Sequence, residues 1–192
     1  MKYYIDFHTA TARDISSLYF QLHLLLINNV NNVDNLAVAF PRYTPKNENK
    51  KGKIGSVIRL FSPTKEALEN INIYGDLISP DAEISVSGIL PVPDEVICHA
   101  VFRRSKRRTE SHFRRIAKRS VSFGNASTED EVFDSIKKNN ISKGNSDPSI
   151  SLKSHSTKQR FPLHISITPS LNPKAGTFCS YGLSQGATVP IF

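Results

Sequence analysis

The sequence predicts an α+β fold, and three observations support that prediction. Strand-like and helix-like patterns alternate along the 192 residues, in the order β-α-β-β-α-β over the first half. Hydrophobic residues make up 39% of the chain and include eleven Phe, so a packed core is expected rather than disorder. Cys98 and Cys179 are far apart and without CxxC spacing, which is not the pattern of a disulfide scaffold or a zinc cluster.

The first half of the chain predicts four strands and two helices. Residues 2–7 (KYYIDF) are β-prone, and an apolar stripe at three- and four-residue spacing then predicts a helix that Asp14 caps. The later elements are a strand at 36–40, a strand at 54–61, a short helix with Pro63 near its start and Leu68 on it, and a strand at 83–89. This order is that of a ferredoxin-like, RRM-like domain, a fold that many RNA-binding domains share and that also hosts other functions.

The second half is expected to be a divergent α/β domain that carries an Arg-rich helix. The sequence LPVP at 90–93 predicts a boundary between two domains, residues 1–92 and 93–192. Within the second domain, the sequence predicts a strand at 96–102, a helix at 110–120 capped by Thr109, and a helix that runs from a capping box of Thr128 and Glu131 to about Lys138. A mobile loop at 139–148 and strands at 161–168 and 177–183 complete the chain.

The positive charge of the chain is concentrated in its second half. Lys and Arg number 25 against 17 Asp and Glu, which gives a net charge of +8 and a pI near 9.6. Residues 1–92 hold nine of each sign, so the whole excess lies in 93–192, and nine basic residues fall between Arg103 and Arg119. A charge confined to one segment indicates a surface that docks a polyanion; a solvated helix face is the plainer alternative.

The expected helix at 110–120 has a basic face and an apolar face. On a helical wheel the basic residues cover about 140° of one side, while Phe113 and Ile116 lie on the other. The basic residues are Arg114, Arg115, Lys118 and Arg119, and the linker before them adds Arg103, Arg104, Lys106, Arg107 and Arg108. A membrane-surface helix would carry a larger apolar face, so nucleic acid is the favoured ligand. Arg side chains can follow RNA phosphates or contact guanine bidentately, which fits an RNA hairpin and leaves DNA as an open alternative.

His23 is the residue that suggests catalysis. It lies in the apolar helical run LYFQLHLLLI at 18–27, where a single His is most often a structural residue. RNA cleavage without a metal requires a base for the 2′-hydroxyl and an acid for the leaving 5′-oxygen, and imidazole serves both roles near neutral pH. None of the six His falls in an HxH or HExxH pattern, so no metal site is expected. We expect no other cofactor either.

Two segments near the C-terminus resemble a known family. Residues 178–192 (FCSYGLSQGATVPIF) are similar to the terminal signature of the type I-F CRISPR repeat-processing endoribonucleases, and residues 152–161 (LKSHSTKQRF) resemble that family's serine-containing segment. The Arg-rich helix and His23 also follow the family's order, so the resemblance covers essentially the whole chain. It implies a cytoplasmic, metal-independent enzyme that binds the hairpin of CRISPR repeat RNA, cuts at its 3′ base and leaves a 2′,3′-cyclic phosphate. It further implies that the crRNA product stays bound with other type I-F surveillance-complex subunits. The sequence itself has no apolar run near the roughly 18 residues of a membrane span, so no membrane partner is expected.

The resemblance also implies roles for individual residues. His23 would be the general base or acid, oriented by Tyr181, and Ser154 would hold the nucleotide whose 2′-hydroxyl attacks, with Ser156 nearby. Phe161 would stack on the terminal base pair. The remaining RNA contacts would come from basic residues: Arg114, Arg115, Lys118 and Arg119 lining the groove, Arg103 and Arg104 reading bases, and Arg107 and Arg108 in the linker.

Two departures from the family pattern and two rival functions remain open. His155 stands between the two serines where the family pattern has Gln, which raises the question of whether it shares the proton chemistry. Phe102 occupies a position where a base-reading residue is expected. One rival is a family member that holds the crRNA hairpin without turnover. The other is a generic basic RNA-binding protein, which would have no reason to keep His23, Ser154 and Tyr181 together.

Overall fold

The computed structural model describes residues 1–28, 36–47, 51–78, 83–105, 110–124, 128–141, 147–154 and 156–192. Contacts divide the chain into two units. We call Met1–Arg104 together with Asp147–Phe192 the sheet unit, and Ser105–Ser146 the helical unit. The domain boundary expected after residue 92 stays a prediction. Among the described residues, no helix combines the length and the apolar character needed to cross a bilayer.

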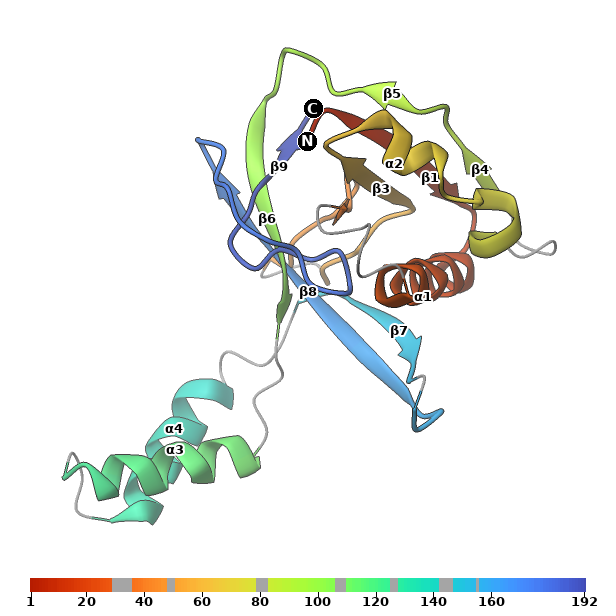
Figure 1. Cartoon of the computed structure of the whole chain (residues 1–192). Coiled ribbons are helices and arrows are strands. Elements are labelled where there is room, and N and C mark those ends of the chain that lie inside the picture. Colours follow the sequence, from red (N-terminus) through yellow and green to blue (C-terminus); the bar gives the residue numbers. More distant parts are fainter. Residues whose placement is uncertain are drawn as a thin grey trace. The chain divides into compact units, whose positions relative to one another are not determined.

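The first sheet of the sheet unit has the ferredoxin-like strand order. Its strands run in the order β2-β3-β1-β4, and β5 also pairs with β1 (Figure 1). The strands are β1 (Tyr3–Thr9), β2 (Ala37–Ala39), β3 (Val57–Ser62), β4 (Ile84–Val86) and β5 (Leu90–Pro91). Each neighbouring pair is antiparallel. The α+β fold with a ferredoxin-like sheet is therefore confirmed, and part of the LPVP sequence forms a paired strand.

The helices of this half differ from expectation mainly at their first residues. Helix α1 (Ala12–Asn28) begins before Asp14, so Asp14 is not its N-cap. Instead the backbone N–H of Asp14 donates to Thr11 Oγ1 (3.2 Å), while Asp14 Oδ2 accepts from the backbone N–H of Thr11 (3.1 Å). This reciprocal pair is a capping box with Thr11 as the cap. Helix α2 (Lys65–Glu69) is capped by Thr64, so Pro63 precedes the cap, and a π-helix (Ile73–Leu77) follows it.

The second sheet was predicted only in part. Its order is β7-β8-β6-β9, with β6 (Cys98–Ser105), β7 (Ser149–Lys153), β8 (Arg160–Ser170) and β9 (Val189–Ile191). Strand β7 was not expected. The strand predicted at 177–183 is wrong: this segment is a loop held by an isolated bridge between Phe178 and Ser184, and the last strand comes later, at β9.

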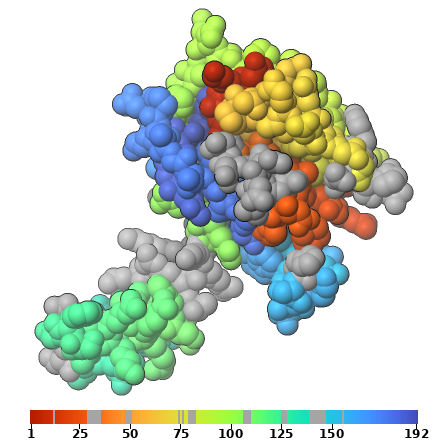
Figure 2. Space-filling model, viewed as in Figure 1, coloured from red at the N-terminus to blue at the C-terminus, as the bar shows by residue number. Residues whose placement is uncertain are grey.

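One hydrophobic core joins the two sheets. Leu22 on α1, Leu60 on β3, Phe102 on β6 and Leu163 on β8 are all buried in it. The C-terminal segment ends beside the N-terminus (Figure 1). The rings of Tyr4 and Phe192 lie 5.0 Å apart there. From the same viewpoint, Figure 2 shows residues of the N-terminus (red), α2 (yellow) and the C-terminal segment (blue) reaching the surface on one face of the sheet unit.

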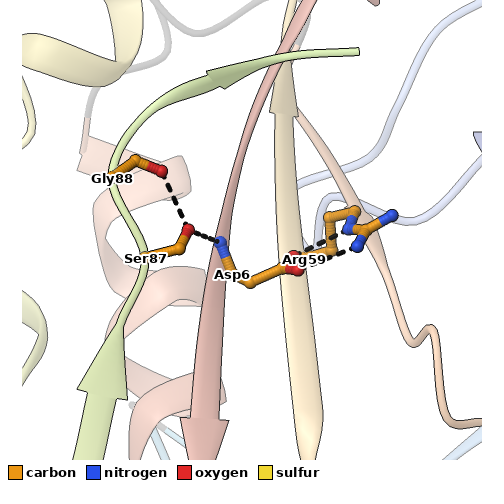
Figure 3. A network of polar contacts seen from close by, with 4 residues as sticks. All are labelled: Asp6, Arg59, Ser87 and Gly88. Atoms are coloured by element: carbon orange, nitrogen blue, oxygen red, sulfur yellow. Dashed lines mark hydrogen bonds and ion pairs between the residues drawn. The ribbon is translucent and has the colours of Figure 1, made fainter. Parts of the chain in front are cut away.

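A buried ion pair joins the central strands of the first sheet. Arg59 donates from Nε and Nη2 to the two carboxylate oxygens of Asp6, at 2.7 and 2.8 Å (Figure 3). The backbone N–H of Asp6 donates to Ser87 Oγ (2.9 Å), which ties in the segment after β4. The Arg59 guanidinium carbon also lies 4.5 Å from the ring centroid of Tyr4 and 4.1 Å from that of Phe192. This network therefore ties β1 and β3 to the C-terminal residue.

The helical unit is a pair of helices with a small core of its own. Helix α3 (Glu110–Ser122) packs on α4 (Glu129–Ile141) through Phe113, Ala117 and Phe133. Lys137 pairs with Glu110 at 3.0 Å. The expected cap at Thr128 is present, because its hydroxyl accepts from the N–H of Glu131 (3.4 Å). Helix α4 continues to Ile141, so the mobile loop predicted from residue 139 begins too early, and its residues 142–146, like Thr109, lie outside the described residues.

Candidate active site and basic surface

His23 is anchored through one of its two ring nitrogens. It lies on α1, half-buried, and its Nδ1 is 2.7 Å from the backbone carbonyl oxygen of Ser180. A carbonyl oxygen only accepts hydrogen bonds, so Nδ1 carries the proton. In the neutral ring Nε2 is then unprotonated and available as a base.

Tyr181 fixes the plane of the His23 ring. The two rings stack with centroids 3.8 Å apart and planes 5° from parallel. The backbone carbonyl of Tyr181 accepts a hydrogen bond from the hydroxyl of Tyr19 (2.8 Å). Tyr19 is 1% exposed, and burial raises the pKa of its hydroxyl well above the ordinary value, so it remains a donor. His23 and Tyr181 are thus brought together as expected.

A tight turn in the C-terminal segment presents Ser180 and Tyr181 to α1. The N–H of Gly182 donates to the carbonyl of Cys179 (2.7 Å), and Gly182 has a φ of 67°. The carbonyl of Gly182 accepts from the N–H of Val38 on β2 (2.8 Å). A Cβ at Gly182 would lie 2.5 Å from Val38 Cγ2, so only glycine fits this approach.

The surroundings of His23 favour its neutral form. Burial lowers the pKa of His23, and the positive charge of Arg104 lowers it further, while the bond to the Ser180 carbonyl raises it. The guanidinium carbon of Arg104 lies 5.6 Å from the ring centroid of Tyr181. The net result is a pKa below the ordinary value of His, which suits a proton acceptor near neutral pH.

The serine segment forms a second polar cluster in the sheet unit. Ser154 directly follows β7, which packs against α1, and its hydroxyl lies 3.3 Å from that of Ser156. The turn is closed by the N–H of Thr157, which donates to Ser154 Oγ (3.2 Å), and by Lys158, whose N–H donates to the Ser154 carbonyl (3.0 Å). Among the described residues, the hydrogen bonds of Ser154 stay within this turn, whereas His23 bonds to the Ser180 carbonyl and stacks on Tyr181. His155 lies outside the described residues.

The aromatic and linker candidates lie on the second sheet. Phe161 on β8 pairs in register with Leu152 on β7 and is partly buried against the core. Arg103 and Arg104 are exposed near the end of β6. Arg107 and Arg108 lie outside the described residues.

The basic face of α3 is exposed, as predicted. Phe113 and Ala117 are buried in the core of the helical unit, while the four basic residues Arg114, Arg115, Lys118 and Arg119 are exposed. Arg114 lies over the ring of Phe133, with 4.6 Å between guanidinium carbon and centroid, and Arg115 Nη2 is 3.3 Å from His112 Nδ1. The amphipathic division of this helix is therefore confirmed.

Two residues that shape the site were not predicted. Tyr19 precedes His23 by one helical turn, so its spacing was a usable signal that the two face one direction. Ser180 contributes only its backbone carbonyl, and every residue type has one.

Comparison with known proteins identifies the family of the chain. A search of curated proteins gives no match. The family model for a CRISPR-associated protein (Cas_Csy4) matches residues 4–192, which includes both sheets, the basic helix and every candidate residue from His23 to Tyr181. The chain therefore belongs to the Csy4 family of CRISPR-associated proteins, which bind and process CRISPR repeat RNA.

Proposed function

We propose that the chain is a metal-independent endoribonuclease that binds the stem-loop of a CRISPR repeat and cuts at its 3′ base. The products are a mature crRNA with a 2′,3′-cyclic phosphate and a fragment with a 5′-hydroxyl. The crRNA stays on the protein within a cytoplasmic complex of other type I-F subunits. Family membership supports the RNA-processing role, and the site supports the chemistry.

The arrangement of His23 is the observation that carries this proposal. Its Nδ1 donates a hydrogen bond to the Ser180 carbonyl, and stacking on Tyr181 fixes the plane of the imidazole ring. Nε2 of the neutral ring then takes the proton of the 2′-hydroxyl as the 2′-oxygen attacks the adjacent phosphorus and the bond to the 5′-oxygen breaks. The leaving 5′-oxygen takes a proton from solvent water. A group positioned for proton transfer typically raises the rate by about 10² to 10⁴. The lowered pKa of His23 favours the base role over the acid role.

The other candidates position the RNA. Ser154 and Ser156 offer paired hydroxyls that hold the attacking nucleotide. His155, between them in the sequence, is the second candidate for proton transfer. Phe161 stacks on the terminal base pair of the stem. The exposed face of α3 follows the stem phosphates, with Arg107 and Arg108 adding contacts from the linker.

Cleavage of the cognate repeat RNA in excess EDTA tests this function. The expected result is one cut at the 3′ base of the stem, a cyclic phosphate end, and no cleavage when the attacking nucleotide is 2′-deoxy. A scrambled stem of the same length serves as the control and should remain uncut. Retarded but intact RNA would indicate a binding subunit without turnover, and equal binding of both stems would indicate a generic RNA-binding protein.

A further inference from the structure

Arg103 and Arg104 are adjacent in β6 but have different neighbours. Alternate side chains of a strand leave the backbone toward opposite faces of its sheet, so the two side chains start from opposite faces of β6. The backbone carbonyl of Arg103 accepts from Ser166 Oγ on β8 (3.4 Å), and its side chain is exposed. Arg104 instead lies over Tyr181. The two arginines therefore need not share one role.

Tyr181 connects Arg104 to His23. A guanidinium within about 6 Å of an aromatic centroid is attracted to the negative face of the ring, and the 5.6 Å separation meets that condition. The same tyrosine ring stacks on His23 at 3.8 Å. Arg104 thus contacts the ring that stacks on His23, and its charge lowers the pKa of His23.

We propose that Arg104 is a positioning residue of the active site, which holds Tyr181 against His23 and keeps the imidazole in its neutral, proton-accepting form. The proposal rests on the proposed function only for the role of His23 as the base. It leaves Arg103, on the opposite face of β6, as the residue available for a base contact.

Most other charged groups near α1 have partners of their own or are exposed. Helix α1 packs against β1, β3, β7 and the π-helix Ile73–Leu77. The charged or titratable residues of these elements are Tyr3, Tyr4, Asp6, His8, Arg59, Tyr74, Asp76 and Lys153, and the first turn of α1 adds Arg13 and Asp14. Asp6 and Arg59 pair with each other, Asp14 is bound to Thr11, and His8, Arg13 and Lys153 are exposed. Tyr19 and Cys179 adjoin Tyr181. Among the described residues, Arg104 is the charged side chain that shifts the pKa of His23.

An NMR titration of the imidazoles in the RNA-free protein tests this role without relying on cleavage. The His23 signal is identified by its loss in His23→Gln. In Arg104→Met the pKa of His23 should rise, since a charge is removed while the apolar stem is kept. Arg104→Lys retains the charge and should return the pKa toward its original value. Arg103→Met removes the same charge from the opposite face and should leave the titration of His23 unchanged.

The pH dependence of single-turnover cleavage gives the second readout. With saturating hairpin RNA, the acid limb of the profile should move to higher pH in Arg104→Met, because more of His23 is protonated at a given pH. An unchanged His23 titration in Arg104→Met, or an equal shift in Arg103→Met, would overturn the proposal. A shifted titration in a protein that cleaves no repeat RNA would support the placement of Arg104 while overturning the proposed function.

Discussion

The imidazole of His23 and the ring of Tyr181 stack with centroids 3.8 Å apart, although they lie at opposite ends of the chain. The His23 hydrogen bond to Ser180 spans 157 positions of sequence. The site therefore exists only once the C-terminal segment has folded onto α1. Substitutions that disturb the turn at 179–183 should reduce cleavage without touching His23 itself.

Gly182→Ala should test that dependence. The substitution places a Cβ 2.5 Å from Val38 Cγ2 at a φ of 67°, so the turn must shift and carry Ser180 and Tyr181 with it. Gly124→Ala is the matched control, because Gly124 has a similar φ of 71° but open space around its Cβ position. The control should lose only the left-handed strain of about 1–2 kcal/mol in free energy of unfolding. A larger loss and slower cleavage are expected for Gly182→Ala; equal effects would contradict the packing argument.

Arg59→Met should destabilise the fold strongly. It leaves the buried carboxylate of Asp6 without its bidentate partner, and removing one member of a buried pair typically costs about 3–5 kcal/mol. Chemical denaturation measures the loss. The double variant Asp6→Leu with Arg59→Met should recover part of it, because no unpaired charge remains. A double variant no more stable than Arg59→Met would show that the loss comes from the missing packing of the guanidinium against Tyr4 and Phe192 rather than from the unpaired charge.

The elements that the sequence predicted are those with a strong local period. The apolar stripe of α1 and the basic stripe of α3 recur at helical spacing, and β8 alternates cleanly. Strand β7 was missed because only Ile150 and Leu152 alternate within its five residues, after a stretch rich in Ser, Asn and Gly. The final strand was misplaced because Tyr181 and Leu183 look β-prone, whereas the φ of Gly182 turns the chain between them.

The candidate site also contains residues that the sequence indicated and contacts that only the fold creates. His23 stood out as an imidazole on an apolar helix, and Tyr181 and Ser154 came from motif resemblance. The Ser180 carbonyl and the Asp6–Arg59 pair are products of tertiary contact, the latter across 53 positions, and no local pattern encodes them. The neighbourhood of Arg104 is likewise a tertiary feature: its sequence shows a basic run, and only the fold places it over Tyr181.

His23→Ala should abolish cleavage and leave hairpin affinity within a few-fold. A proton-transfer group supplies about 10²–10⁴ in rate and little ground-state binding. Single-turnover rates and filter binding with the repeat hairpin measure the two quantities. His8→Ala, an exposed imidazole on β1, is the control and should cleave normally. His155→Ala belongs in the same series, with a smaller effect expected. Near wild-type rates in His23→Ala would remove His23 from the mechanism.

Binding of the hairpin should depend strongly on salt through the basic face of α3. Four phosphates neutralised by Arg114, Arg115, Lys118 and Arg119 would contribute about −3 to −4 to the slope of log affinity against log salt. Replacing all four with Ala should flatten the slope by that amount. Four exposed cations of the sheet unit, Lys2, Arg13, Lys53 and Lys174, provide a charge-matched control with little expected change. An unchanged slope in the α3 variant would mean that this face does not contact RNA.

The enzyme should make essentially one turnover per hairpin. The basic face of α3 binds the phosphates of the stem, and a cut at the 3′ base leaves the stem intact. The product therefore keeps nearly all phosphate contacts of the substrate. Binding that is equal before and after the cut lowers the free energy of the bound RNA and does not promote release. Release, rather than chemistry, should then limit steady-state turnover.

Product formation with repeat RNA in excess over enzyme measures this at moderate salt. A burst close to one product per enzyme, followed by a slow phase, is expected. Raising the salt should speed the slow phase, because the retained contacts are to phosphate and weaken as counterions compete. The variant with all four basic residues of α3 replaced by Ala should also show a faster slow phase, already at moderate salt. Its burst should be of similar size if enough hairpin is supplied to saturate the protein. Sustained linear turnover without a burst would show that product leaves freely, and would count against a role as a subunit that stays on its RNA.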